Sequence, residues 1–165
     1  NCITLPALIL TLASSLAPAE DWPQWRGPNR DGRSTETGIN PDWKKHPPKL
    51  LWRSEGCGRG FSSVSIADDT LYTSGNFESG QGISAFSTKT GKLLWQTAVT
   101  DKIPKHGYGG ARPVPTIDGD KLSLPTSIGL TACHTTNPKV PRATNLNYSA
   151  TAQGSPPAPG TSLTS

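Results

Sequence analysis

A segment that occurs twice constrains the fold of this chain more than any other feature. Residues 82–95 (GISAFSTKTGKLLW) align without a gap with residues 129–142 (GLTACHTTNPKVPR), at an offset of 47 positions. A period of about 40–50 residues, built from short strands and turns, is typical of the blades of a β-propeller. The repeat therefore predicts an all-β architecture, and it leaves the activity open.

The first copy has the pattern of a β-hairpin. Alternating residues at 82–87 and a second apolar run at 93–99 flank a loop that contains Gly91. A glycine supplies the positive φ that such a loop needs. Trp95 lies on the returning strand, where we expect its large aromatic surface to pack on the sheet.

The second copy lacks two of these features. Pro138 stands in place of Gly91, and Arg142 stands in place of Trp95. Proline cannot take a positive φ, and Pro141 also removes a donor from the expected strand. The second unit is therefore predicted to be weaker than the first.

A second pair of segments supports the same period. Residues 63–72 resemble residues 113–122, and Asp118-Gly119 is a strong signal for a two-residue hairpin turn. A third similarity relates Lys49–Trp52 to Lys92–Trp95, since both segments have the sequence KLLW. Each unit then consists of four short antiparallel strands, as one propeller blade does.

The run from Ala85 to Trp95 resembles the repeat of the pyrroloquinoline-quinone (PQQ)-like β-propellers. That repeat usually contains Ala, a bulky residue and Asp, followed by Thr-Gly-Lys and Trp; here Ser87 stands where the Asp is usual. Residues 21–32 (DWPQWRGPNRDG) also resemble the start of exported bacterial members of the group. The resemblance covers about residues 20–142, and it is specific for the superfamily, not for an activity.

The resemblance implies more than one role, because the superfamily includes quinoprotein dehydrogenases, an outer-membrane assembly scaffold and many exported proteins. The dehydrogenases hold PQQ with adjacent cysteines, a stacking tryptophan and acidic and asparagine ligands to Ca²⁺. This chain has no adjacent cysteines. We therefore expect no catalytic residue, no metal site and no cofactor, and residues that would bind a cofactor are unknown. The expected function is a binding or scaffold module; the alternative is an N-terminal piece of a periplasmic PQQ-dependent quinoprotein oxidoreductase, which would use PQQ and Ca²⁺.

The N-terminal sequence predicts export. Residues 3–16 are mostly apolar, and Ala17 and Ala19 form a small-residue cleavage pattern. A basic leading region and an initiating Met are missing, so we interpret residues 1–19 as the remnant of a signal peptide. The expected location is periplasmic or secreted, with no transmembrane anchor because the apolar stretch is too short.

Four regions follow from these patterns: the signal remnant 1–19, an irregular lead-in at 20–48, the propeller repeats at 49–142 and a low-complexity tail at 143–165. The tail is rich in Ser, Thr, Ala, Pro and Gly, so disorder is expected there. The repeat region holds one good blade, at 49–99, and a partial one. Propellers close with about 4–8 blades, so an incomplete propeller, which is a fragment of a ring, is predicted.

Charge adds little to the functional argument. The net charge is +4, and the basic residues of segment 26–59 are scattered among Pro and Gly. A solvated loop is the better interpretation, and export disfavours nucleic acid as a partner. The expected partners are proteins or components of the cell envelope.

Other residue types have simple structural roles as the first interpretation. Tryptophans at the repeat position are expected to pack; for Trp22 and Trp25, stacking by Arg26 and Arg30 is the alternative to packing. Aspartates in turns are expected to form local backbone bonds, and the histidines have no metal spacing. Cys133, which replaces Phe86, is expected to be buried, and a disulfide with Cys57 has little support. The spacing of the glycine-rich segment 56–61 does not fit a dinucleotide site. The tryptophans, aspartates and histidines with these expected roles are Trp22, Trp25, Trp43, Trp52, Trp95, Asp68, Asp69, Asp118, Asp120, His46, His106 and His134.

Overall fold

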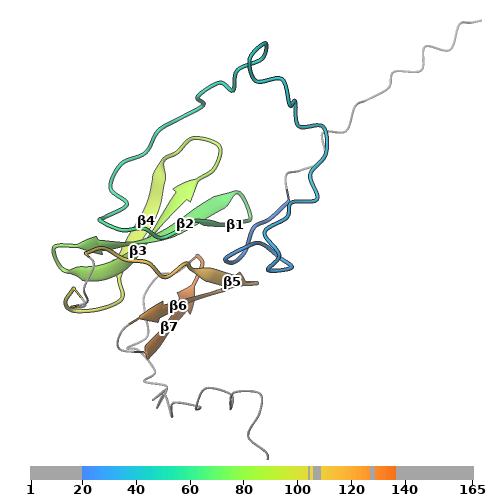
Figure 1. Cartoon of the computed structure of the whole chain (residues 1–165). Coiled ribbons are helices and arrows are strands. Elements are labelled where there is room, and N and C mark those ends of the chain that lie inside the picture. Colours follow the sequence, from blue (N-terminus) through green and yellow to red (C-terminus); the bar gives the residue numbers. More distant parts are fainter. Residues whose placement is uncertain (1–19, 104, 106–108, 127–128, 137–165) are drawn as a thin grey trace, which may run out of the picture.

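Two antiparallel sheets make up the fold. The computed structural model describes residues 20–103, 105, 109–126 and 129–136, and these residues contain no helix. The first sheet has four strands in sequence order, and the second has three (Figure 1). The strands are β1 (Ser65–Ala67), β2 (Thr70–Phe77), β3 (Gly80–Ser87) and β4 (Leu93–Ala98), then β5 (Thr116–Asp118), β6 (Lys121–Thr126) and β7 (Gly129–His134).

The all-β prediction is confirmed, and the predicted hairpins form. β3 and β4 pair in antiparallel register, with Ala85 opposite Trp95 and a bulge after Ala85. Gly91 in their connection has φ of 70°, as the turn requires. A Cβ there would lie 2.7 Å from the ring of Trp52, so this tryptophan packs directly on the turn.

The two short turns before β2 and β6 share a positive φ at their first residue. Asp68 and Asp69 have φ of 48° and 58°, and Gly119 has φ of 57°. The prediction of an Asp118-Gly119 turn is wrong by one residue, because Asp118 pairs with Lys121 in the ladder. The loop consists of Gly119 and Asp120, so the first hairpins of the two sheets are offset by 51 positions.

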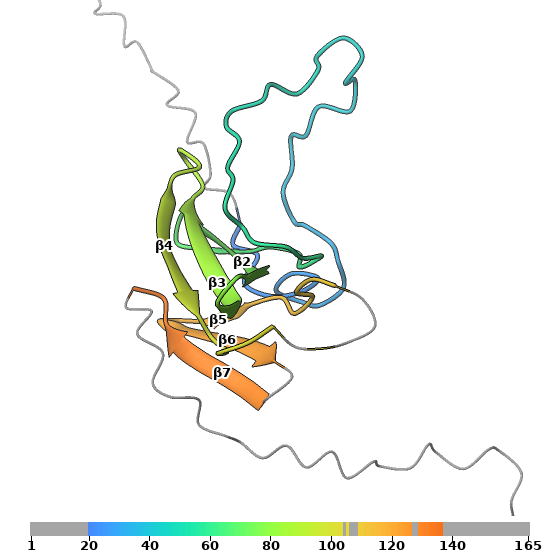
Figure 2. The same ribbon diagram turned by 90° about the vertical axis from the view of Figure 1, so that its left-hand side faces the viewer.

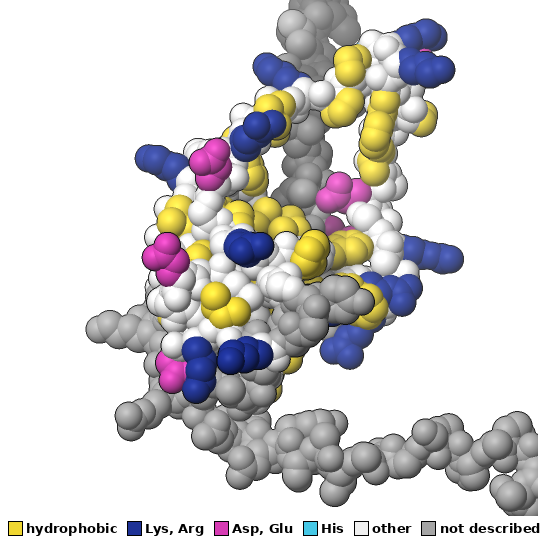
Figure 3. Space-filling model, turned by 60° about the vertical axis from the view of Figure 1, so that its left-hand side comes forward, with side chains coloured by type: hydrophobic (Ala, Val, Ile, Leu, Met, Phe, Trp, Pro, Cys, Tyr) yellow, Lys and Arg dark blue, Asp and Glu magenta, His cyan; other side chains and the backbone are white. Residues whose placement is uncertain are grey.

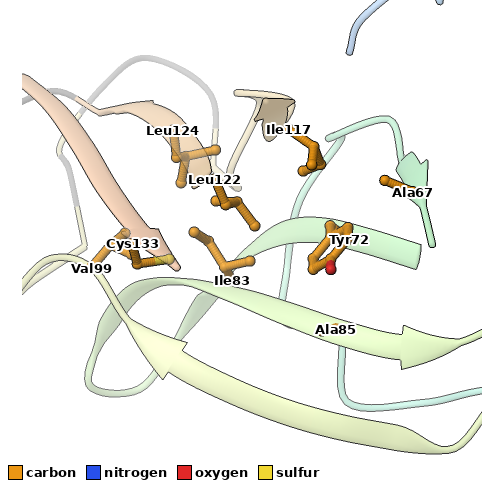
Figure 4. Close-up of a cluster of buried hydrophobic side chains, with 9 residues drawn as sticks. All are labelled: Ala67, Tyr72, Ile83, Ala85, Val99, Ile117, Leu122, Leu124 and Cys133. Carbon is orange, nitrogen blue, oxygen red and sulfur yellow. The ribbon is translucent and has the colours of Figure 1, made fainter. Parts of the chain in front are cut away.

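The core lies between the sheets, which face each other across it (Figure 4). Ile83 on β3 has no exposed surface, and neither do Leu122 and Leu124 on β6. Burying a large apolar side chain stabilises a fold by about 1.5–3 kcal/mol. The other members of this cluster are Ala67, Tyr72, Ala85, Val99, Ile117 and Cys133.

The lead-in ties the sheets together at one point. Trp22 exchanges two backbone hydrogen bonds with Ile66 on β1, and the amide of Ile117 on β5 donates to the carbonyl of Pro23. Beyond this bridge, residues 20–48 contain no strand, as expected for an irregular segment. The chain then makes a long excursion away from both sheets before it returns to β1 (Figure 2).

Two boundaries differ from the predictions or lie outside the described part. The first sheet begins at Ser65, and residues 49–64 contain no strand beyond two isolated bridges, Arg59 with Asn76 and Gly60 with Ala111. Several predictions concern residues that lie outside the described part: the signal remnant 1–19, the tail 143–165 and the substitutions at Pro138, Pro141 and Arg142.

No helix long and apolar enough to cross a membrane is found among the described residues.

Candidate functional site

An open groove of about 880 Å³ lies along the first sheet. The β2–β3 hairpin forms one wall, and the glycine-rich segment before β1 forms another. Two residues of β4 and the connection after it complete the lining. The residues are Gly56, Gly58, Arg59, Asn76, Phe77, Glu78, Ser79, Leu93, Gln96, Ile103, Gly109 and Gly110.

Glycines allow the wall formed by the segment before β1 to approach the sheet. A Cβ on Gly75 would collide with the carbonyl oxygen of Cys57, and one on Gly58 would lie 2.9 Å from the ring of Phe77. Real Cβ atoms do not tolerate such contacts. The glycine-rich segment therefore packs on β2, which explains its composition better than a nucleotide loop would.

A buried amide lies in this groove. Asn76 is 6% exposed, and its Oδ1 accepts no hydrogen bond from the described residues. Its backbone is fully used, since it exchanges two hydrogen bonds with Arg59. A buried polar atom without a partner costs about 1–3 kcal/mol, and Oδ1 is itself closed to solvent, so it lowers the stability of the fold beside the groove.

The rest of the lining offers binding contacts of several kinds. Arg59 and Glu78 carry opposite charges, while Phe77, Leu93 and Ile103 supply apolar surface. The described lining residues include neither histidine nor cysteine; the hydroxyl and carboxylate of the lining belong to the exposed residues Ser79 and Glu78. The arrangement suits recognition of an amphipathic ligand.

Two tryptophans make the same contact in successive sheets. The Nε1 of Trp52 donates to the carbonyl of Thr88 at 2.6 Å, and the Nε1 of Trp95 donates to the carbonyl of Thr135 at 3.0 Å. Each carbonyl belongs to the residue that follows the third strand of its sheet, β3 or β7. The predicted packing role of both tryptophans is confirmed, and Trp95 also lies 5.9 Å from the ring of Tyr72.

The other tryptophans do not gather into a site. Trp25 and Trp43 are 62% and 63% exposed. The guanidinium of Arg26 lies 5.5 Å from the ring centroid of Trp25, which is the stacking alternative, whereas Arg30 donates to the side chain of Gln24. Trp22 packs against Gly27, where a Cβ would lie 2.7 Å from the ring.

The aspartates serve the turns. The carbonyl of Asp69 accepts hydrogen bonds from the amide and hydroxyl of Thr88. The carbonyl of Asp120 accepts the same two bonds from Thr135. Asp68 lies in the first turn and Asp118 ends β5, and the described residues contain no group of three or more His, Cys, Asp and Glu that could hold a metal ion.

The histidines fall in different surroundings. His46 lies on the exposed excursion, and His106 lies outside the described residues. His134 on β7 lies 3.1 Å from the carboxylate of Asp120, a pair that sequence spacing did not reveal. Both side chains are more than half exposed, so the pair is a surface contact.

Both described cysteines are free thiols. Cys133 is 4% exposed and belongs to the core, as its replacement of Phe86 predicted. Burial raises the pKa of this thiol. Cys57 is half-buried beside β2.

Charged side chains are dispersed over the surface. In the space-filling view, Lys and Arg lie at several separate places among hydrophobic and uncharged side chains (Figure 3).

Comparison with known proteins adds no assignment. No protein-family model matches the chain, and no curated protein matches it.

Proposed function

We propose that the chain is an exported PQQ-like β-propeller repeat protein that acts as a binding or scaffold module. The observation that carries the proposal is the equivalent pair of tryptophan contacts, Trp52 to Thr88 and Trp95 to Thr135. They support the view that the two sheets are successive blades, one with four strands and one with three. Small rigid sheets that stack in this way present surfaces for partners.

The groove beside the β2–β3 hairpin is the proposed binding surface. Phe77 and Leu93 provide apolar contact, and Arg59 and Glu78 provide charges of opposite sign. An apolar hollow with a few polar groups is the usual form of a ligand site. Because the chain is expected in the cell envelope, a protein or envelope component is the proposed occupant.

Site-specific photocrosslinking tests this surface. A photoreactive side chain at Ser79, on the rim of the groove, should yield discrete adducts in envelope fractions. The same probe at the exposed Thr90, in the β3–β4 turn, is the matched control. The adducts should disappear in an Arg59→Ala background. Identical patterns from both positions would contradict the proposed site.

A cofactor titration separates this proposal from an oxidoreductase. The chain is mixed with PQQ and Ca²⁺ and assayed for dye-linked oxidation of alcohols and sugars. The expected result is neither a bound quinone absorption band nor activity. A saturable band, or dye reduction that depends on PQQ, would overturn the scaffold proposal in favour of a quinoprotein.

A further inference from the structure

The second sheet exposes a face that the first sheet buries. Leu130 on β7 is 41% exposed, and its counterpart in the repeat, Ile83 on β3, has no exposed surface. Ala132 is exposed as well, whereas its counterpart Ala85 is fully buried. The reason is that the second sheet covers this face of the first, and no described residue does the same for the second.

Among the described residues, one outer edge of the same sheet is also unpaired. In the first sheet β4 pairs with β3, but none of the described residues pairs with the outer edge of β7. The residues that follow in the sequence include Pro138 and Pro141, which have no N–H to donate to a ladder. An unpaired edge is a template for a strand from another chain.

The segment Lys49–Ser54 resembles a strand in sequence but has no partner strand among the described residues. Its first four residues are identical to Lys92 and the first three residues of β4. Leu50 and Leu51 are 72% and 81% exposed. Trp52 nevertheless contacts the first sheet as Trp95 contacts the second, so the segment lies where the fourth strand of a preceding sheet would lie.

We propose that Lys49–Ser54 of one copy of this chain pairs with β7 of a second copy, as the fourth strand of that copy's second sheet. The register of β3 and β4 fixes the alignment. Trp52 would lie opposite Ala132, as Trp95 lies opposite Ala85, and Ser54 would lie opposite Leu130, as Thr97 lies opposite Ile83. The inference goes beyond the proposed function, since it does not depend on any ligand of the groove.

The proposed contact is made by two different surfaces. Within one copy Lys49–Ser54 is held against the first sheet by Trp52 and by the Ser54 hydroxyl, which donates to Gly91, so it does not reach β7. Copies therefore associate head to tail. Such contacts produce a ring if the rotation closes and a filament if it does not.

Mixing two variants tests this arrangement. Leu51→Asp disables the segment and Leu130→Asp disables the edge; both side chains are exposed, so circular dichroism should show intact sheets. In sedimentation velocity, the unmodified chain should form oligomers, and each variant alone should be monomeric. An equal mixture should form dimers, because one intact surface of each kind remains. Ile39→Asp, at a 66% exposed position outside both surfaces, should assemble like the unmodified chain.

A disulfide trap tests the register without relying on those variants. A chain with Ser54→Cys, Leu130→Cys and Cys57→Ser should form intermolecular disulfides on mild oxidation, and chains with either new cysteine alone should not do so through the predicted pair. A monomeric unmodified chain at every concentration would overturn the proposal. A monomeric mixture, equal disruption by Ile39→Asp, or trapping that does not need both cysteines would also overturn it.

Discussion

The strands β3 and β7 occupy the same place in the repeat but differ in burial. Seven of the eight residues of β3 are buried, from Gly80 to Phe86, whereas buried and exposed residues alternate along β7. The difference lies in their neighbours, because β3 has another sheet on one face and the Trp52 segment near the other. The burial of a strand therefore depends on what packs against each face of its sheet, and the sequence of the strand alone does not determine it.

The hairpins that contain these strands also differ in length. β2 and β3 each have eight residues, while β6 and β7 each have six. The longer hairpin ends in Asn76–Ser79, and these residues form a wall of the groove. The groove thus depends on the extra length of the first hairpin.

The largest expected effect comes from the contact between the units. Trp95→Ala removes the packing against Tyr72 and the hydrogen bond to Thr135, and loss of a large packed aromatic typically costs about 3–5 kcal/mol. Urea denaturation followed by circular dichroism measures the loss. Trp43→Ala, at an exposed position, should leave the midpoint nearly unchanged. Equal losses for the two variants would show that Trp95 does not join the sheets.

The two turn glycines distinguish the units more finely. Gly119→Ala places a side chain at positive φ in open space, which should cost about 1–2 kcal/mol. Gly91→Ala adds a clash with the ring of Trp52 at 2.7 Å, so it should cost more. The two free energies of unfolding, measured side by side, test whether Trp52 lies on the turn. A smaller cost for Gly91→Ala would contradict that placement.

The smallest effect concerns alkaline pH and the buried groups of the core. Burial raises the pKa of Cys133 above its ordinary value of 9.0 and that of Tyr72 above 10.0. The unfolded chain then releases these protons first as the pH rises, so the free energy of unfolding falls above about pH 9.

Urea denaturation at a series of pH values measures this dependence. Cys133→Ala should flatten the first part of the decline, and Cys57→Ala should not. If the free energy of unfolding of Cys133→Ala falls with pH as steeply as that of the unmodified chain, the thiol does not cause the decline.

Local patterns predicted much of this fold. The apolar alternation of the strands, the turn at Gly91 and the packing of Trp95 were all readable, because each depends on neighbouring residues. The turn at Gly119-Asp120 was misplaced by one residue, since Asp118 suits a turn but its backbone completes the ladder with Lys121. At this position the register of the sheet outweighs the turn propensity of Asp118.

The groove and the His134–Asp120 pair were not predicted. Both depend on which residues lie opposite each other across strands, and one sequence does not give that register. The glycine-rich segment 56–61 carried a usable signal, because closely spaced glycines can mark a tight backbone approach as well as a phosphate loop. Its partner Gly75 lies in the middle of β2, where a glycine has no local reason to occur.

Hydrogen exchange at the indole N–H groups, followed by NMR, tests whether two equivalent tryptophans join successive units. We expect slow exchange for Trp52 and Trp95, which donate to Thr88 and Thr135, and fast exchange for the exposed Trp25 and Trp43. Protection of one member of the pair without the other would show that the two contacts are not equivalent. Fast exchange at both would contradict the stacked arrangement itself.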